Sequence, residues 1–464
     1  MQLSHEFVGA VAVFDDENLV SCAGLVPVLD LAEQAGLSGL VASKVTLRST
    51  RVRSAGANPA GKVAAIVAGM AAGADSIDDL EVIRSGGMSQ LFAGVYAATT
   101  LGQFLREFTF GHSRQLASVS RAHLVALIGR TGCLPGIAER CFVDIDSLLR
   151  PVYGHAKQGA SYGHTKIASK QVLRLGLSPL ATTISTVGAA PMIAGIRLRG
   201  GSAGSGRGAG SMVTEAINTA RAAGASGTVM VRGDSAFGSW AVIGAALAAD
   251  AEFSVVMAKN QAVARAIGTI DEDAWRPVRY PGAVQDPDTG AWISDAEVAE
   301  VPYTAFARSS HPVTARLIVR RVRDATTQDA LFPAWRYHPF LTNNTEPADQ
   351  ADITHRRHAV VETTFADLIS GPLAHLPSGK FGANSAWAIC AGITHNLLRA
   401  VGALAGGACR NARGATLRTR IVNVPARLAR PQRRPVLHLP AHWPWARAFT
   451  RLAAALTHGP PIPA

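Results

Sequence analysis

The stretch Phe142-Val143-Asp144-Ile145-Asp146-Ser147-Leu148 places two carboxylates inside an otherwise apolar run. Side chains alternate between the two faces of a β-strand, so Asp144 and Asp146 share one face of the strand that we predict over Cys141–Leu148. A buried charge is costly unless it is paired or bound to a metal. The stretch therefore predicts a buried strand with ionic or metal chemistry on one face.

The residues after this strand predict a mixed α/β fold. Short apolar runs between turns predict strands at Pro179–Thr186, Pro191–Leu198, Thr228–Arg232 and Glu252–Met257. Apolar residues at helical spacing predict helices at Met212–Ala223 and Ser239–Ala249. The order is three strands, a helix, a strand, a helix and a strand, and we expect the first three strands to form a sheet edge built from hairpins.

Two more carboxylates occur where a ligand would be held. Asp234 ends the apolar run Val229–Arg232, at the carboxyl edge where open α/β sheets bind their ligands, and Glu362 lies in a helix predicted over Ala351–Ile369. Asp146, Asp234 and Glu362 would supply hard oxygen donors from two strands and a helix. Such donors suit a pair of Mg²⁺ ions, for which Mn²⁺ can substitute, and ions about 4 Å apart can assist phosphodiester displacement.

The chain divides into five predicted segments. Residues 1–135 read as helices, 136–264 as the first part of an α/β core, and 265–345 as a β-rich insertion with strands at Ala315–Val322 and Arg336–Thr342. Residues 346–408 read as closing helices of the core, and 409–464 as an arginine-rich C-terminal region.

The positive charge is concentrated at the C-terminal end. The formal net charge is +12, and no Asp or Glu follows Asp367, whereas 12 Lys and Arg residues do. The first 367 residues hold equal numbers of acidic and basic residues. The C-terminal excess can neutralise nucleic-acid phosphates, although a solvated basic tail is the alternative.

Composition argues against several protein classes. The five cysteines are odd in number and form no CxxC pair, which disfavours a disulfide scaffold or zinc ribbon and suits reduced, buried thiols in the cytoplasm. The first residues do not resemble a secretory signal. Val63–Ala74 is too short to span a membrane, and Ala386–Ala408 contains His395, Asn396 and Arg399, so we expect buried helices and no membrane association.

A glycine-rich loop at Gly200–Gly210 follows a predicted strand and precedes a predicted helix, as a phosphate-binding loop does. Arg207 and Gly208 stand where a P-loop needs a Lys and a metal-binding Ser or Thr. The sequence therefore argues against a P-loop nucleotide hydrolase and favours a flexible connection.

Several blocks occur in a distinctive order along the chain: DDENLVSCAGL, DIDS, VYGHAKQGASYG, VRGDSAFGS, HRRHAVVETTFADL, HLPSGKFGANSAW, HNLLR and LRTRIVNVPARLARPQRRPVLHLPAHWPW. In this order they resemble the DDE transposases of bacterial insertion sequences, specifically the family numbered thirteen-eighty. The resemblance covers nearly the whole chain.

The resemblance implies an RNase H-like catalytic core with a β-rich insertion between the second Asp and the Glu. It implies catalytic and metal-binding roles for Asp146, Asp234 and Glu362, with Asp144 as the alternative first ligand. It also implies a cytoplasmic, nucleoid-associated enzyme that cleaves and transfers strands at terminal inverted repeats and target DNA, as a homodimer or a larger assembly.

The chain departs from the wider superfamily in the helix that carries Glu362. Where that superfamily often has Tyr, Arg and Lys, this sequence has His355, His358 and Ile369. Basic side chains near Glu362 and in the C-terminal region are the predicted DNA contacts: Arg356, Arg357, His358, Arg418, Arg420, Arg433 and Arg434. The N-terminal helices are expected to read sequence, and the C-terminal arginines to contact phosphates.

Three alternatives stay open from the sequence. Phe237 and Trp387 are candidates for stacking on an extruded base, but they fit a hydrophobic core better. A catalytically inactive DNA-binding relic or regulator is the second alternative, which the presence of all three carboxylates disfavours. A metal-dependent nuclease without strand transfer would use the same three ligands.

Overall fold

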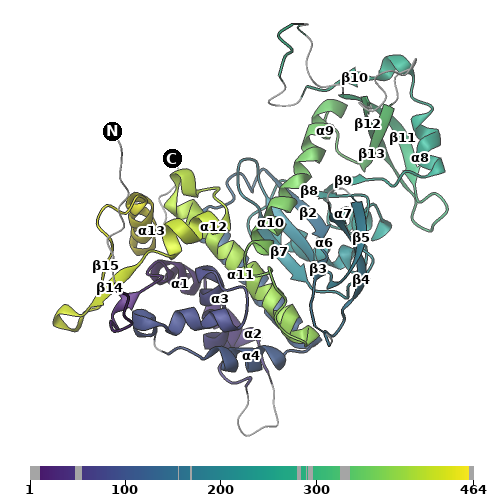
Figure 1. The fold of residues 1–464 in the computed structure, drawn as a ribbon. Helices are drawn as coiled ribbons and strands as arrows, with labels where there is room; N and C mark the ends of the chain where they lie inside the picture. Colours follow the sequence, from purple (N-terminus) through teal and green to yellow (C-terminus); the bar gives the residue numbers. More distant parts are fainter. Residues whose placement is uncertain are drawn as a thin grey trace.

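The computed structural model describes residues 11–47, 55–92, 94–154, 156–167, 170–279, 284–288, 290, 296–323 and 335–458. Figure 1 shows three regions: a helical assembly that contains both the N-terminal and the C-terminal segments, a central sheet with helices packed on it, and a group of strands that projects beyond the sheet.

Nine strands of the described residues form one mixed sheet, in the order β10-β11-β12-β13-β9-β8-β2-β6-β7. The five that belong to the predicted core are β2 (Arg140–Ser147), β6 (Leu180–Ser185), β7 (Met192–Arg197), β8 (Thr228–Gly233) and β9 (Glu252–Val256). β2 pairs antiparallel with β6 and parallel with β8, and β8 is parallel to β9. The prediction that the first three strands form one edge of the sheet from antiparallel neighbours is confirmed, since β2, β6 and β7 end the sheet in this order, and β2 joins this edge to the parallel strand β8.

The two faces of β2 have different partners. Val143 and Ile145 belong to a hydrophobic core shared with α6 (Ala209–Ala222) and α7 (Trp240–Ala248). The opposite face, which carries Asp144 and Asp146, lies toward α10 (Val360–Ile369). The alternation of apolar and acidic residues in the sequence thus separates a dry packing face from a polar one.

The projecting strands extend the same sheet beyond β9. They are β10 (Arg276–Pro277), β11 (Ala296–Ala305), β12 (Val313–Arg323) and β13 (Trp335–Thr342), and α8 (Gln261–Ile267) precedes them. β13 pairs antiparallel with β9, so the added strands continue the central hydrogen-bond ladder. The strands predicted at Ala315–Val322 and Arg336–Thr342 lie within β12 and β13, whereas β11 was not predicted.

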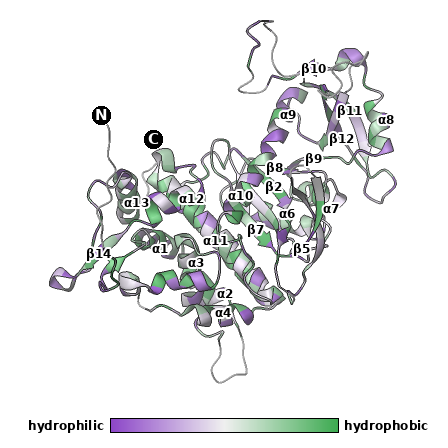
Figure 2. Ribbon diagram, in the orientation of Figure 1, coloured by the Kyte–Doolittle hydropathy of each residue, from purple (hydrophilic) through white to green (hydrophobic). Residues whose placement is uncertain are grey.

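The chain returns from these strands to the central sheet through α9 (Ala348–Arg356). A single helix was predicted over Ala351–Ile369, but a 3₁₀ turn at Arg357–Ala359 separates α9 from α10. His355 holds α9 on the sheet, since its ring stacks on Phe340 with centroids 4.2 Å apart and its Nδ1 lies 2.8 Å from Ser254 Oγ. Figure 2 shows hydrophilic residues along α9, as expected for a helix with one packed face.

The helical assembly forms around α11 (Phe381–Ala405). The helices before β2 are α1 (Leu25–Gln34), α2 (Leu37–Lys44), α3 (Pro59–Ala72), α4 (Ala98–Arg106) and α5 (Phe110–Thr131), with 3₁₀ segments at Asp78–Arg84 and Gly86–Leu91. One hydrophobic core joins these helices to α10, α11 and the C-terminal region. Among the described residues α11 is the one helix long and apolar enough to cross a membrane, and 94% of its most apolar window is buried inside the protein.

The C-terminal arginine-rich region is folded against the N-terminal helices. It contains α12 (Gly414–Leu417), a π-helical turn at Arg418–Val422, β14 (Ala426–Ala429), β15 (Val436–His438) and α13 (Ala446–His458). β14 lies between β1 (Leu19–Val20) and β15 in a small sheet. The two ends of the described chain are therefore structurally joined.

A β-hairpin that was not predicted follows β2. It consists of β4 (Ser161–Ile167) and β5 (Lys170–Leu177), with β3 (Arg150–Pro151) beside β5. Glycines let its backbone approach the glycine-rich loop closely, since a Cβ on Gly163 would lie 2.3 Å from the Gly201 carbonyl oxygen. Leucine alternates with other residues in β5, at Leu173, Leu175 and Leu177, whereas β4 is polar and shows no such alternation.

Candidate active site

Asp146 and Asp234 lie at the carboxyl ends of neighbouring parallel strands. The ladder between β2 and β8 ends with Ile145 opposite Gly233, so the next residue on each strand is one of these two aspartates. Neighbouring strands are about 4.8 Å apart. The Ser147 N–H donates to Asp146 Oδ1 at 2.6 Å, and the Ala236 N–H donates to Asp234 Oδ1 at 2.9 Å. Asp146 is half-buried and Asp234 is exposed, and both follow the carboxyl ends of paired strands.

Asp144, the alternative first ligand, forms an ion pair with Arg232. Its two carboxylate oxygens accept hydrogen bonds from Arg232 Nε at 2.7 Å and Arg232 Nη2 at 2.9 Å. Both side chains are 1% exposed, and the Arg232 guanidinium also covers the Phe142 ring at 4.0 Å. Arg232 Nη1 donates to the Thr354 carbonyl of α9 at 2.8 Å. This bidentate pair joins β2, β8 and α9. In the sequence, an arginine at the end of the apolar run Val229–Arg232 is the signal that could have indicated the pair.

Glu362 lies in the first turn of α10 and is exposed. Other residues of α10 hold the helix in place: Val361, Phe365 and Leu368 belong to the core shared with α11. Asp367 is buried and binds the guanidinium of Arg399 of α11, while Arg413 Nε donates to its Oδ1. Glu362 therefore extends from a fixed helix that packs against β2.

The three predicted ligands do not form a closed metal cage. Within the part of the chain that the structure describes, no group of three His, Cys, Asp or Glu side chains is close enough to hold one ion. The ladder ends one residue before Asp146 and Asp234, and α10, which carries Glu362 in its first turn, packs against β2. Asp146 and Asp234 offer only carboxylate oxygens as ligands. Such ligands suit Mg²⁺, which keeps several of its bound waters, better than they suit Zn²⁺.

The glycine-rich loop lies beside this edge. Ser205 Oγ is 3.2 Å from Ser147 Oγ, next to Asp146. The buried Arg199 donates from Nη1 to the carbonyl oxygens of Gly204, Ser205 and Arg207 at 2.8 to 3.2 Å. Burial lowers the pKa of Arg199 to about 10, which leaves it charged at neutral pH. Three carbonyl oxygens of the loop thus bind the Arg199 guanidinium of the protein itself. This agrees with the argument that the loop does not bind phosphate.

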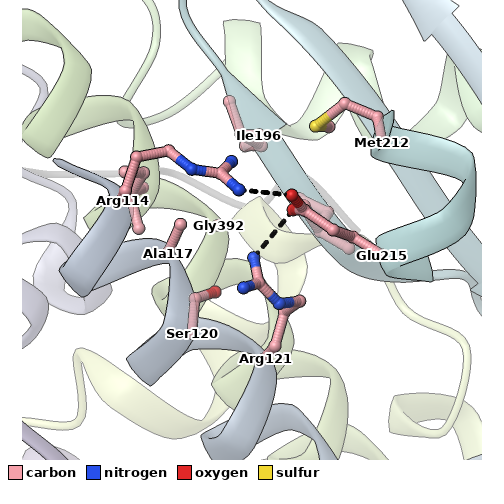
Figure 3. Close-up of a pocket in the computed structure, with 11 residues that line it drawn as sticks. Arg114, Ala117, Ser120, Arg121, Ile196, Met212, Glu215 and Gly392 are labelled. Carbon is pink, nitrogen blue, oxygen red and sulfur yellow. Dashed lines mark hydrogen bonds and ion pairs between the residues drawn. The ribbon is translucent and has the colours of Figure 1, made fainter. Parts of the chain in front are cut away.

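A charge cluster joins the α/β core to the helical assembly (Figure 3). Glu215 of α6 accepts hydrogen bonds from Arg114 and Arg121 of α5 and from Arg197 of β7; Arg121 Nη1 lies at 2.9 Å and Arg197 Nη2 at 3.1 Å. The cavity beside it is about 10 Å³, roughly the space of one water molecule. Burial lowers the pKa values of Arg121 and Arg197, and Glu215 opposes this effect. The cluster is a structural contact and not a substrate pocket.

The predicted DNA contacts near Glu362 are placed differently from one another. Arg356 and Arg357 are exposed, and Arg357 lines a hollow of about 420 Å³ together with Phe142 and Arg232. His358 is half-buried, and its Nδ1 lies 2.6 Å from the His355 carbonyl oxygen. The histidine that replaces the usual Tyr, His355, is buried, and its pKa is well below the usual value because of burial. It packs α9 and does not face solvent.

The C-terminal arginines also differ. Arg418 is 9% exposed and donates to the Ser370 carbonyl at 3.2 Å, and burial lowers its pKa. The prediction that Arg418 contacts DNA is therefore corrected: it supports the end of α10. Arg420 is half-buried with its guanidinium 5.4 Å from the Trp445 ring, and Arg434 is exposed beside β15. The backbone of Arg433 lies in a 3₁₀ turn next to Arg434.

Phe237 and Trp387 are core residues. Both are 0% exposed, and Trp387 Nε1 donates to the Pro372 carbonyl at 2.6 Å. Phe237 packs under Gly233, where an added Cβ would lie 3.0 Å from the Phe237 Cβ. Neither ring is available to stack on an extruded base in this structure, in agreement with the core interpretation.

The sequence matches the family model described as Transposase DDE domain group 1 over residues 8–461. The search of curated proteins found no match. The family number thirteen-eighty stays a prediction. Because the match spans nearly the whole chain, including both aspartate strands and the Glu362 helix, the protein belongs to the DDE transposases.

Proposed function

We propose that this DDE transposase binds the terminal inverted repeats of an insertion sequence and cleaves and transfers DNA strands at the edge formed by Asp146 and Asp234. The observation that carries the proposal is the ladder between β2 and β8, which ends one residue before each aspartate. Numbered along the chain, the five core strands lie in the order 3-2-1-4-5, with the fourth and fifth parallel to each other and the first parallel to the fourth. This order supports an RNase H-like core.

The proposed catalytic residues are Asp146, Asp234 and Glu362. Their hard oxygen donors fit two Mg²⁺ ions, for which Mn²⁺ can substitute. When bound, such ions activate the attacking oxygen and stabilise the leaving oxygen of an in-line displacement. Asp144 is not proposed as a ligand, because its oxygens already accept two hydrogen bonds from Arg232.

The proposed reaction has two steps. In the first, water attacks a phosphodiester phosphorus, the bond to the 3′ oxygen breaks, and that oxygen leaves as a 3′ hydroxyl. In the second, the 3′ hydroxyl loses its proton and attacks the phosphorus of another phosphodiester, the bond from that phosphorus to its own 3′ oxygen breaks, and the leaving oxygen takes up a proton. One P–O bond replaces another, so the step requires no oxidant or energy source. Asp146 and Asp234 would hold the metal ions that bind the reacting phosphate at the sheet edge, and Glu362 would complete the site from α10.

The proposed partners are the terminal repeats and a target DNA, bound by a homodimer or a larger assembly in the cytoplasm in association with the nucleoid. Arg356 and Arg357 are proposed to contact DNA near the site because both are exposed at the end of α9. Arg420, Arg433 and Arg434 are proposed to contact phosphates farther away. The arginine-rich region is suited to this because it carries no opposing acidic residue.

Cleavage of a labelled duplex that carries the element's own ends tests this proposal. The intact chain is expected to cleave with Mg²⁺ and not with chelator, and alanine at Asp146, Asp234 or Glu362 is expected to abolish cleavage while DNA binding persists. A joined product with target DNA distinguishes a transposase from a nuclease that only hydrolyses. Tight binding with no cleavage by the intact chain would contradict the catalytic proposal and favour an inactive relic or regulator.

A further inference from the structure

The last acidic residue of the chain, Asp367, lies near the end of α10, the helix that carries Glu362 in its first turn. Its carboxylate accepts hydrogen bonds from two arginines that follow it in the sequence. Arg399 Nη2 of α11 donates to Oδ2, and Arg413 Nε, just before α12, donates to Oδ1. The Gly414 N–H also donates to Oδ2, at 3.4 Å. We call Asp367, Arg399 and Arg413 the ion triad.

The ion triad is buried at its centre. The side chains of Asp367 and Arg399 are 3% and 4% exposed, whereas that of Arg413 is 45% exposed. Burial lowers the pKa of Arg399, and the Asp367 carboxylate opposes this effect. Arg399 also donates to the Ala412 carbonyl, so it binds both α10 and the segment that leads into α12. Since a buried ion pair is costly to break, these contacts hold Asp367 in one position.

The other side chains of α10 do not fix the helix in direction. Its apolar side chains belong to the core shared with α11, and apolar contacts are non-directional. Thr363 donates to the Val360 carbonyl of its own helix at 2.6 Å, and Thr364 Oγ1 is buried without a hydrogen-bond partner. Among the described residues, the side-chain hydrogen bonds from α10 to other elements are therefore those of Asp367.

Glu362 lies on a different side of α10 from Asp367. Five residues separate the two, which in an α-helix corresponds to about 7.5 Å along the axis and about 140° around it. Glu362 is exposed, in agreement with this geometry, and Asp367 is buried. A rotation or a slide of α10 would therefore move the Glu362 carboxylate relative to β2, the strand that carries Asp146 and packs against α10. The ion triad opposes both movements, because its two arginines bind Asp367 from different segments.

We infer that Asp367 is a positioning residue: the ion triad sets the rotation of α10 and thereby the position of the Glu362 carboxylate. This inference rests on the proposed function, in which Glu362 completes the metal site. Mg²⁺ demands near-ideal octahedral geometry, and a shift of about 1 Å in a catalytic group can lower a rate about 100-fold. Loss of the ion triad therefore changes the use of metal and the rate of cleavage, and not the affinity for DNA.

The test compares Asp367→Asn with Glu215→Gln in the full chain. Glu215 binds three arginines of α5 and β7, in a cluster that includes no residue of α10, so it controls for the loss of an ion-paired carboxylate elsewhere. In Asp367→Asn the Mg²⁺ concentration for half-maximal cleavage is expected to rise about 10-fold and the maximal rate to fall about 100-fold, with the Kd for the element's ends unchanged. Glu215→Gln is expected to leave all three values unchanged.

Hydrogen exchange of the metal-free protein gives a readout that does not depend on cleavage. The amides of Val361–Leu368 are expected to lose protection in Asp367→Asn and to keep it in Glu215→Gln. Arg413→Gln leaves the buried pair of Asp367 and Arg399 intact, so it decides the test if Asp367→Asn does not fold. Its maximal rate is expected to fall about 10-fold, whereas Arg410→Gln, a change at an exposed arginine outside the ion triad, should have no effect on the rate.

An unchanged Mg²⁺ requirement and maximal rate in Asp367→Asn would overturn the inference even if α10 loses protection, because Asp367 would then only stabilise the helix. Unchanged protection of α10, or equal rates for Arg413→Gln and Arg410→Gln, would overturn it as well. Cleavage by the intact chain is scored separately. Its failure contradicts the proposed function, whereas normal cleavage by the intact chain and by the ion-triad variants contradicts only the positioning role.

Discussion

Asp144 and Arg232 lie opposite each other in the parallel ladder between β2 and β8 and form a bidentate ion pair with both side chains 1% exposed. Asp146, two residues later on the same strand face, is half-buried at the open edge. Identical side chains on one face of one strand thus have different environments. Asp144 is held in the fold by a buried ion pair, and Asp146 is half-buried at the carboxyl end of the strand.

Asp144→Asn is expected to destabilise the protein, because it leaves the buried Arg232 guanidinium without its counter-charge. Removal of one partner of a buried ion pair costs about 3–5 kcal/mol. Asp146→Asn is expected to change the free energy of unfolding by less than about 1 kcal/mol, since the side chain is partly solvated. Urea unfolding of the two variants measures the difference. Equal destabilisation by both would contradict the separation of roles.

Glu215→Gln is expected to weaken the contact between α5 and the α/β core. The change removes the negative charge that Arg114, Arg121 and Arg197 share, and the carboxylate is about one-fifth exposed, so we expect a loss of about 1–2 kcal/mol. Chemical denaturation checks the magnitude. Glu300→Gln, which removes a more exposed partner of Arg316, is the control and is expected to cost less. A larger effect in the control would contradict the prediction.

His123 is expected to make the fold sensitive to acid. Burial lowers the pKa of His123 to about 4, below its usual value of 6.5. The unfolded chain therefore binds a proton below pH 6.5 that the folded protein does not. Stability is fully present above about pH 6.5 and falls as the pH drops toward 4, by about 3 kcal/mol from this residue.

His123→Leu is expected to make the fall in stability between pH 6.5 and pH 4 shallower, although His355, also buried with a lowered pKa, continues to contribute. Denaturant unfolding across this range measures the slope. His375→Gln, at a position where the side chain is 60% exposed, is the control and should leave the slope unchanged. The same slope in His123→Leu and the intact chain would show that His123 does not drive acid sensitivity.

Arg418 and Arg434 are expected to respond differently to substitution. Arg418→Gln should lower stability by about 1–3 kcal/mol, because the buried guanidinium donates to Ser370 and lies near Asp367. Arg434→Gln should leave stability unchanged and reduce the salt slope of DNA binding by about 0.9. Unfolding and binding titrations of both variants provide the comparison. A reduced salt slope with normal stability in Arg418→Gln would restore its role as a DNA contact.

The core strands could be predicted from the sequence because short apolar runs and turns mark them directly. The position of β2 inside the sheet could not, because it depends on pairing with β8, which is 88 residues away in the case of Asp144 and Arg232. The hairpin of β4 and β5 was missed, since β4 is polar and the close approach of Gly163 to Gly201 depends on tertiary contacts; the alternating leucines of β5 were the signal that could have found it.

The candidate site could be predicted in part. The sequence predicts Asp146, Asp234 and Glu362 as ligands, which stays a prediction, and it left Asp144 open because two residues on one strand face are equivalent by pattern alone. Only the partner, Arg232, distinguishes them. The sequence also treated the C-terminal arginines as one group, whereas packing buries Arg418 and leaves Arg434 exposed. A count of charged residues does not predict which of them are buried, because burial depends on tertiary contacts.

A metal-specificity switch tests the central claim most directly. Asp146→Cys replaces a hard oxygen donor by a thiolate, which binds Mg²⁺ poorly and Mn²⁺ better. Cleavage of the element's ends by Asp146→Cys is predicted to be lost in Mg²⁺ and to recover in Mn²⁺. Asp144→Cys is predicted to be destabilised and to show no recovery specific to Mn²⁺. Full activity of Asp146→Cys in Mg²⁺, or recovery in Mn²⁺ by Asp144→Cys alone, would contradict the assignment of Asp146 as a metal ligand at the edge of the sheet.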